Sequence, residues 1–332
     1  MCSTESDLFL DIGSTNIKWR RGGEDVIHQV AFPLPVVDKT PRFEVAPDAV
    51  VQVVSEIIDA VLPARVFFAV QMHGYLLLRK GRVVTNYISW RDERGARCLP
   101  DFTLTPEYGV GLKPNLPRLS LLAPHEAADE LCTLGSYLVR LLTGYNRTHI
   151  TDAAATGFYN VVRGTADRSH LLLPEAAYAV ECAGKYRGCK VYTPVGDMQA
   201  AVFGGTAGHD AGRYYLLNLG TAGQMCVLSE KFTAGDFESR PYFHEKTLCT
   251  VTRLPGGAAL RTGSAAERRV FAAACADALR RLPQRRGILA MGGTALAHRA
   301  WLEPILKDTG LPTVFCAGGE AVRGLELLSE EV

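Results

Sequence analysis

The stretch DLFLDIGSTNIKWR, residues 7–20, decides the class of fold. An apolar run over 7–12 meets the small polar turn Gly-Ser-Thr-Asn, and a second strand-like run follows over 17–20, which is the pattern of a hairpin. Residues 21–25, RGGED, turn again, and 26–30 predict a third strand of an antiparallel meander. The pattern is not strand–turn–helix, and neither GxGxxG nor GxxxxGK[ST] occurs in it. It therefore predicts neither a dinucleotide-binding turn nor a P-loop.

A second hairpin of the same kind begins at residue 214, with YYLLNLGTAGQMCVL over 214–228. Its segment LNLGTA (217–222) matches LDIGST (10–15): an apolar strand, a glycine, a hydroxyl residue and a return strand. Two such hairpins, each opening one half of the chain, predict two domains of like topology. The glycine-rich stretch 204–212 is interpreted as the link between them. The predicted domains are residues 1–207 and 208–332.

Composition excludes several classes of protein. The 332 residues suit two domains at about 100–200 residues each. The chain has 36 Lys and Arg against 35 Asp and Glu, without the basic excess of nucleic-acid binders. No apolar run approaches the ~18 residues of a membrane span, and the polar N-terminus resembles neither a secretory nor a transit peptide. The nine cysteines are scattered without a CxxC pair, which favours free thiols in a reducing cytoplasm over disulfides or zinc ligands.

Periodicity predicts the other main elements. Apolar residues at helical spacing indicate helices over 47–62 and 127–142, the latter closed by Gly144, and a helix beginning at 199–203. The wholly apolar run 66–70 indicates a buried strand, and 75–78 another. The fold class is therefore α/β.

The two glycine-hydroxyl turns predict phosphate binding. Such a turn exposes backbone N–H groups in a concavity that suits phosphate oxygens, and two turns suit a triphosphate. Asp11, at the tip of the first strand, suits Mg²⁺, which takes one or two carboxylates beside phosphates and waters. The alternative for each turn is an ordinary hairpin connection.

Asp197 follows Gly196 and precedes a helical run. A carboxylate at a helix N-terminus is favoured in its ionised form, so Asp197 suits the acceptance of a proton. A simple helix cap is the alternative.

Polar residues at the end of the buried strand 66–70 suit a small ligand, because α/β sheets bind ligands at strand ends. His73 can donate to a ligand hydroxyl and Met72 can pack on a carbon chain. Gln71, Trp90 and Asp92 are further candidates. A histidine satisfied by the backbone is the alternative for His73.

The ordered set of motifs resembles the FGGY carbohydrate kinase family, within the actin/Hsp70/hexokinase-like superfamily, and in particular its xylulokinase and sedoheptulokinase branch. The matching segments are DIGSTNIK (11–18), VQMHG (70–74), ISWRDER (88–94), YLVRLLTG (137–144), TDAAATG (151–157), PVGDMQAA (194–201), LGTAG (219–223), MGGT (291–294) and EAVRG (320–324).

The resemblance implies two ribonuclease H-like domains that face each other across a cleft. It implies an ATP- and Mg²⁺-dependent transfer of phosphate to a ketose such as xylulose, with Asp197 as catalytic base and Asp11 as metal-directing residue. Gln71, Met72, His73, Trp90 and Asp92 are the implied sugar contacts. The implied nucleotide contacts are Gly13, Ser14, Thr15, Lys18, Gly220, Thr221, Gly292, Gly293 and Thr294.

The chain is shorter than is usual in this family, mainly between residues 257 and 291, so the predicted second domain is reduced. Three alternatives stay open: a kinase for sedoheptulose, a kinase for another polyol, and a non-catalytic sugar- or nucleotide-binding relative. The expected partners are a small sugar and ATP, without nucleic acid or membrane, in the cytoplasm. The choice between monomer and homodimer is open.

Overall fold

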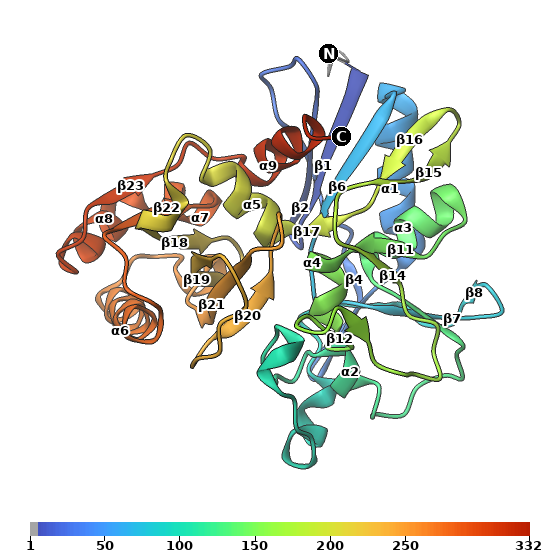
Figure 1. Ribbon diagram of the computed structural model, residues 1–332, viewed down its shortest axis with the longest axis horizontal. Helices are drawn as coiled ribbons and strands as arrows, with labels where there is room; N and C mark the ends of the chain where they lie inside the picture. The colour runs from blue at the N-terminus through green and yellow to red at the C-terminus, as the bar shows by residue number, and fades with distance from the viewer. Residues whose placement is uncertain (1–5) are drawn as a thin grey trace. The chain divides into compact units, whose positions relative to one another are not determined.

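The computed structural model describes residues 6–332, so Cys2 and the polar N-terminal residues lie outside the described part (Figure 1). The chain divides into two compact units. The first is Met1–Asp197 with Leu325–Val332, and the second is Met198–Gly324. The predicted boundary at 207/208 differs from this division, which falls at Asp197 and again near the C-terminus.

A seven-stranded mixed sheet forms the centre of the first unit. Its order is β15-β16-β6-β1-β2-β3, with β17 also paired to β6. The strands are β1 (Asp7–Ile12), β2 (Asn16–Arg21), β3 (His28–Ala31), β6 (Arg65–Val70), β15 (Cys182–Tyr186), β16 (Cys189–Tyr192) and β17 (Val195–Gly196). β1, β2 and β3 are antiparallel, whereas β6 runs parallel to β1, β16 and β17. The predicted meander is confirmed, with its third strand two residues later than expected.

Two helices cover one face of this sheet. α1 (Pro47–Val61) begins with proline in its first turn, where the missing N–H costs no hydrogen bond. Its buried stripe and that of α3 (Leu134–Thr143) share one core with alternate side chains of β1 and β6, such as Leu10 and Phe68. Gly144 ends α3 in the left-handed conformation, as predicted.

The remaining elements of the first unit form small sheets and short turns. They are β4 (Pro35–Lys39), β5 (Arg42–Val45), β7 (Leu76–Arg79), β8 (Arg82–Val83), β9 (Tyr87–Ile88), β10 (Glu130–Cys132), β11 (Arg147–His149), β12 (Tyr159–Asn160), β13 (Thr165–Ala166), β14 (Glu175–Ala177), α2 (Pro117–Ser120), α4 (Ile150–Ala153), η2 (Arg94–Asp101), η3 (Pro106–Tyr108) and η4 (Ala154–Thr156). The predicted helix over 127–142 is wrong in its first part, because β10 pairs with β7 there. The helix starts only after Thr133, whose hydroxyl caps it.

The second unit repeats this topology around a six-stranded sheet of order β20-β21-β19-β18-β22-β23. Its first strand, β18, has an antiparallel neighbour on one side and a parallel neighbour on the other, as β1 has. The strands around β18 are therefore paired as those around β1 are. The elements are β18 (Tyr214–Leu219), β19 (Gly223–Ser229), β20 (Glu238–Pro241), β21 (Thr247–Leu254), β22 (Gly287–Met291), β23 (Thr313–Phe315), α6 (Ala265–Arg281), α7 (Gly293–Ala297), α8 (Arg299–Lys307), η5 (Ala211–Arg213) and η6 (Gly257–Ala259).

The glycine-rich stretch from residue 204 is not simply a link, because its first two glycines end helix α5 (Asp197–Gly205). A Cβ at Gly204 would lie 2.0 Å from the carbonyl oxygen of Glu320, at the start of α9 (Glu320–Ser329). In the same way, a Cβ at Gly324 would lie 2.0 Å from the carbonyl oxygen of Ala200. The small residues therefore allow the backbones of α5 and α9 to touch.

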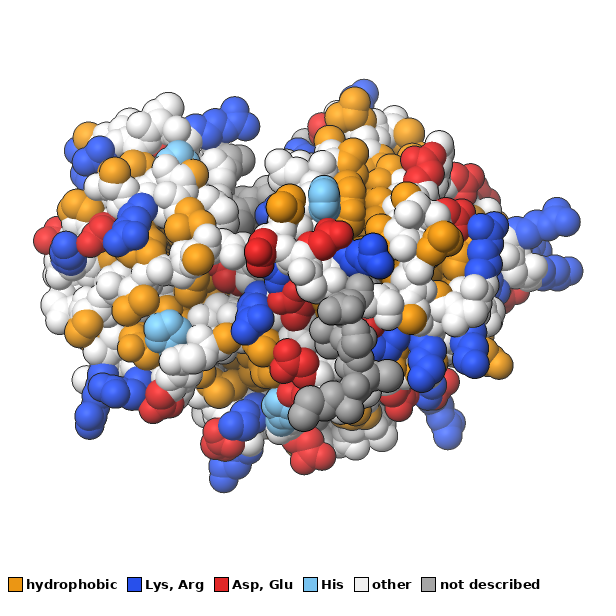
Figure 2. Space-filling view, turned by 90° about the horizontal axis from the view of Figure 1, so that it is seen from above, with side chains coloured by type: hydrophobic (Ala, Val, Ile, Leu, Met, Phe, Trp, Pro, Cys, Tyr) orange, Lys and Arg blue, Asp and Glu red, His pale blue; other side chains and the backbone are white. Residues whose placement is uncertain are grey.

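Basic and acidic side chains are interspersed on the face seen in Figure 2, in keeping with the net charge of +1. Within residues 6–332 no helix has the length and apolar character needed to cross a bilayer. The eight described cysteines are free thiols, as their scatter predicts.

Candidate active site

Three strands of the first unit end side by side. Asp11 of β1 and Val195 of β17 both pair with Ala69 of the parallel strand β6 between them. At about 4.8 Å per strand, their Cα atoms lie roughly 10 Å apart. Beyond this row β1 leads into the predicted phosphate turn, β6 into residues 71–73, and β17 into Asp197. The topology thus brings these predicted residues to one edge of one sheet.

The turn after β1 is tight. The N–H of Gly13 donates to the carbonyl of Asn16 (3.1 Å), and a Cβ at position 13 would lie 3.1 Å from the same oxygen. Ser14 is half-buried and Thr15 exposed. Lys18 of β2 pairs directly with Asp11. Partners in an antiparallel pair point to the same face, so an ammonium and a carboxylate share one side of the sheet beside the turn.

Gln71 contacts this turn. Its backbone N–H donates to the carbonyl of Ile12 (3.0 Å), and its Nε2 donates to the carbonyl of Gly13 (3.3 Å). The side chain is 3% exposed, and its Oε1 has no hydrogen-bond partner among the described residues. A buried acceptor without a partner is unusual and suits a bound ligand or ordered water.

Oxygen donors of this kind suit Mg²⁺. Mg²⁺ is held through one or two carboxylates together with phosphates and waters, so the Asp11 carboxylate and the Gln71 Oε1 are fitting neighbours for a hydrated ion. Among residues 6–332 no three or more His, Cys, Asp or Glu side chains cluster as a metal cage.

His73 follows β6 with a positive φ of 64°. Its Nδ1 lies 2.9 Å from the carbonyl oxygen of Ala155, and its Nε2 lies 3.3 Å from Nζ of Lys113. A carbonyl can only accept, so Nδ1 carries the proton and Nε2 accepts from the lysine. The role of His73 at a sugar hydroxyl stays a prediction. Met72 beside it is 6% exposed.

Asp197 is the first residue of α5 and is half-buried. The helix has nine residues, and the partial positive charge of its N-terminus favours the ionised carboxylate. The residue before it, Gly196, pairs with Val70 of β6, so the helix starts from the sheet edge described above.

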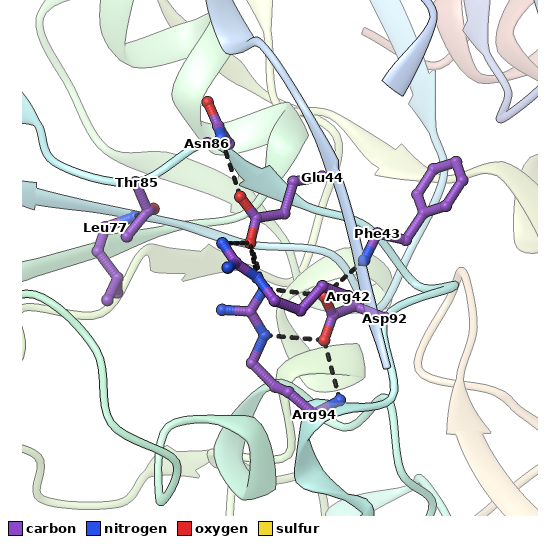
Figure 3. A network of polar contacts seen from close by, with 8 residues as sticks. All are labelled: Arg42, Phe43, Glu44, Leu77, Thr85, Asn86, Asp92 and Arg94. Atoms are coloured by element: carbon purple, nitrogen blue, oxygen red, sulfur yellow. Dashed lines mark hydrogen bonds and ion pairs between the residues drawn. The ribbon is translucent and has the colours of Figure 1, made fainter. Parts of the chain in front are cut away.

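Asp92, a predicted sugar contact, lies in a network of hydrogen bonds within the protein. Its carboxylate is 1% exposed and accepts from the backbone N–H of Phe43 (2.8 Å). It also accepts from the backbone N–H, Nε and Nη2 of Arg94 at 2.8–3.0 Å (Figure 3). Four protein donors therefore occupy both oxygens. Trp90, two residues earlier, is half-buried, and its carbonyl accepts from Asn115 (2.6 Å).

The Asp92 network continues to Glu44. Arg94 and Arg42 each donate to Oε1 of Glu44 at 2.6 Å, and Asn86 donates to Oε2 at 2.9 Å (Figure 3). Burial raises the pKa of this carboxyl, but the three hydrogen bonds outweigh it and leave the pKa below its usual value. The network lines a cavity of about 780 Å³, and none of Asp11, residues 71–73 or Asp197 lines that cavity.

In the second unit the two predicted nucleotide motifs meet. Oγ1 of Thr294 donates to the carbonyl of Gly220 (2.9 Å). Gly292 has a φ of 97°, and a Cβ there would lie 2.4 Å from the carbonyl oxygen of Leu219, so only glycine fits. The buried carboxylate of Glu320 accepts from the backbone N–H of Gly292 (3.3 Å) and fastens this turn to the start of α9. Thr221, which follows Gly220, and Gly293, which follows Gly292, are exposed.

No family model matches the chain, and no curated protein matches its sequence. Solved structures do match it over most of its length. The xylulose kinase of Lactobacillus acidophilus matches with a TM-score of 0.81 and 16% identity, over 98% of this chain and 89% of that one. This is the fold of carbohydrate kinases. The gluconate kinase of the same organism matches with a TM-score of 0.80 and 16% identity, over 98% of this chain and 89% of that one. The Plasmodium falciparum glycerol kinase with ADP matches with a TM-score of 0.77 and 11% identity, over 97% of this chain and 89% of that one.

Two features of this carbohydrate-kinase fold were missing from the sequence prediction. Lys113 is 7% exposed beside His73, yet a single lysine among small residues carries no signal of burial. Gly256 and Gly257 lie against the turn at Gly220: Gly257 N–H donates to the Gly220 carbonyl (2.9 Å), and a Cβ at Gly256 would lie 2.6 Å from the carbonyl oxygen of Thr221. The Pro-Gly-Gly run at 255–257 marked that turn in the sequence.

Proposed function

We propose that this chain is an ATP-dependent sugar kinase that phosphorylates a ketose such as xylulose, with Asp197 as the catalytic base. The observation that carries this proposal is the shared sheet edge on which Asp11, residues 71–73 and Asp197 follow three adjacent strands. Phosphoryl transfer needs alignment, neutralised phosphate charge and a carboxylate that takes the hydroxyl proton. The likeness to xylulose kinase structures supports the same reaction.

Asp197 takes the proton of the acceptor hydroxyl in this proposal. Its place at the N-terminus of α5 favours the carboxylate form, which is the form that accepts a proton. When bound, ATP with Mg²⁺ supplies the phosphoryl group and neutralises its charge.

The remaining residues bind and orient the substrates. Asp11 and Gln71 would hold the hydrated metal, and Lys18 would contact the phosphates. In the first unit Gly13, Ser14 and Thr15 hold phosphate oxygens through the turn. In the second unit the nucleotide contacts are Gly220, Thr221, Gly292, Gly293 and Thr294. Gln71 is thus moved from the sugar to the phosphate side, because its side chain contacts Gly13.

The sugar lies against Met72 and Trp90 in this proposal, and His73 and Lys113 act as a pair. Because Nε2 of His73 accepts from Lys113, the lysine is the donor that such a pair offers to a hydroxyl. His73 follows β6 at the edge that carries Asp197, and Lys113 contacts His73.

The test is a coupled assay of ADP release with a panel of acceptors. The panel contains ketoses (xylulose, sedoheptulose), polyols including glycerol, and gluconate, since gluconate and glycerol kinases share the fold. The expected result is turnover that depends on one ketose and on Mg²⁺. ADP release that no acceptor stimulates contradicts the proposal and supports the non-catalytic alternative.

Asp197→Asn tests the base directly. We expect kcat to fall about 10²–10⁴-fold with little change in the KM of the sugar. Asp48→Asn is the matched control, because Asp48 also lies in the first turn of a helix, α1, and is exposed. If both variants keep more than about a tenth of the activity, Asp197 is only a helix-terminal charge.

A further inference from the structure

The segment before Asp197 is held from two sides. β17 has only two residues, and on one side it pairs with β6. On the other side, the segment 148–151 contacts it. His149 N–H donates to the carbonyl of Pro194 (2.9 Å), and Oγ1 of Thr148 lies 3.1 Å from the same oxygen. The N–H of Gly196 donates to Oγ1 of Thr151 (3.0 Å).

The hydrogen bonds of Thr151 have a single consistent direction. Nδ1 of His149 receives the backbone N–H of Thr151 (3.2 Å), so Nδ1 carries a lone pair and no proton. Oγ1 of Thr151 lies 2.9 Å from the same nitrogen, and its hydroxyl therefore donates to it. The chain runs from Gly196 N–H to the Thr151 hydroxyl and on to a neutral His149.

Burial keeps His149 in that neutral state. The side chain is 1% exposed, and burial lowers its pKa to about 4. Thr151 is also 1% exposed, so water does not compete for its hydroxyl. Gly196 is buried too, so all three members of the chain of hydrogen bonds are shielded from solvent.

We propose that Thr151, oriented by His149, is a positioning residue for Asp197; this inference rests on the proposed kinase function. Gly196 separates the anchored peptide from Asp197 and, lacking a Cβ, leaves its backbone dihedrals with the greatest freedom. The bond to Thr151 removes that freedom at the N–H. The carboxylate of Asp197 is then presented from a fixed start of α5.

The hydroxyl of Thr151 is expected to affect kcat rather than the binding of the substrates. A misplacement of about 1 Å in a reacting group costs on the order of 10²-fold in rate. Thr151 itself is buried behind the strand and does not touch the substrates in this proposal. Loss of its hydroxyl therefore leaves the KM values of sugar and ATP nearly unchanged.

The test compares Thr151→Val, which keeps the volume and loses the hydroxyl, with Thr151→Ser, which keeps the hydroxyl. We expect kcat to fall roughly 10–100-fold in the valine variant and to recover in the serine variant. Thr250→Val is the matched control, because Thr250 is 0% exposed on β21 and its hydroxyl donates to a local carbonyl (Leu248, 3.1 Å). That control is expected to keep its kcat.

Two readouts do not depend on activity. Hydrogen exchange of the Gly196 amide is expected to accelerate in Thr151→Val and to slow again in Thr151→Ser. Nitrogen NMR of His149 is expected to show a protonated Nε2 and a bare Nδ1. Unchanged Gly196 exchange, or a protonated Nδ1 at neutral pH, overturns the inference.

The failure of this inference differs from failure of the proposed function. If the wild type phosphorylates an acceptor and Thr151→Val keeps its kcat within about threefold, the positioning role is wrong and the kinase stands. If the wild type is inactive with every acceptor, the kinase proposal is wrong and the catalytic role of Thr151 falls with it. The exchange and NMR results then still decide the hydrogen-bond chain itself.

Discussion

His149 and Asp152 lie three residues apart, and burial moves their pKa values in opposite directions. Burial raises the pKa of Asp152 from 3.8 to about 6, although hydrogen bonds from the hydroxyls of Thr133 and Thr148 partly oppose the shift. Burial lowers the pKa of His149 from 6.5 to about 4. Each group therefore prefers its neutral form in the folded protein.

The two shifts have opposite consequences for stability. For Asp152 the folded pKa is raised, so its contribution is fully present below pH 3.8 and is lost as the pH rises through about 6. For His149 the folded pKa is depressed, so its contribution is present above pH 6.5 and is lost as the pH falls through about 4. At 1.36 kcal/mol per pKa unit, each change amounts to about 3 kcal/mol. Between pH 4 and 6.5 the two nearly cancel.

Variants that remove one of the two groups reveal how the other changes the free energy of unfolding with pH. In Asp152→Asn, the free energy of unfolding relative to wild type is expected to rise by about 3 kcal/mol from pH 4 to pH 6.5, because only His149 still titrates. In His149→Asn, which keeps an acceptor at the helix cap, it is expected to fall by a similar amount. Urea unfolding at half-unit pH steps measures both, and the difference from wild type removes the titration of all other groups.

The double variant is the control, since its curve is expected to run parallel to that of the wild type. If either single variant differs from wild type by a constant amount across this range, to within about 1 kcal/mol, the group concerned ionises in the folded protein as it does in the unfolded chain. The reasoning from burial is then wrong for that residue.

Three further changes test other parts of the structure. Asp92→Asn is expected to lower stability by about 3–5 kcal/mol, as the loss of one partner of a buried ion pair does, while the sugar KM stays unchanged; a raised KM in a folded variant restores Asp92 as a sugar contact. Gly204→Ala is expected to cost about 1–3 kcal/mol in urea unfolding, because its methyl group has no room against α9, whereas the exposed Gly212→Ala is expected to be near neutral. Lys113→Met and His73→Ala are each expected to raise the sugar KM roughly 5- to 150-fold, and equal KM values in variant and wild type remove the pair from the site.

The hairpins could be predicted because their signal is local. An apolar run, a glycine-hydroxyl turn and a return strand are contiguous at Gly13 and at Gly220, and the structure has both hairpins. The same holds for α1, whose apolar stripe lies within 15 residues.

The role of Asp92 could not be predicted in this way. Its donor Phe43 lies 49 residues away and reaches it only because β5 pairs with β9. Similarly, Gly204 looks like a linker residue until its contact with α9, more than 100 residues later, is known. Local composition describes a residue's conformational freedom, whereas long-range pairing decides what it touches.

The repeated topology also shows where the two units differ. One position before the last pair of each hairpin, Asp11 pairs with Lys18 in the first unit and Asn218 pairs with Gln224 in the second. Gln224 in turn accepts from the buried Arg240 (3.2 Å). One turn is therefore flanked by a carboxylate and an ammonium and the other by neutral amides. A hydrated divalent ion binds carboxylate oxygens, whereas a phosphate chain does not. In the proposed kinase Asp11 would therefore hold the metal, and the turn at Gly220 would contact phosphate or nucleoside alone.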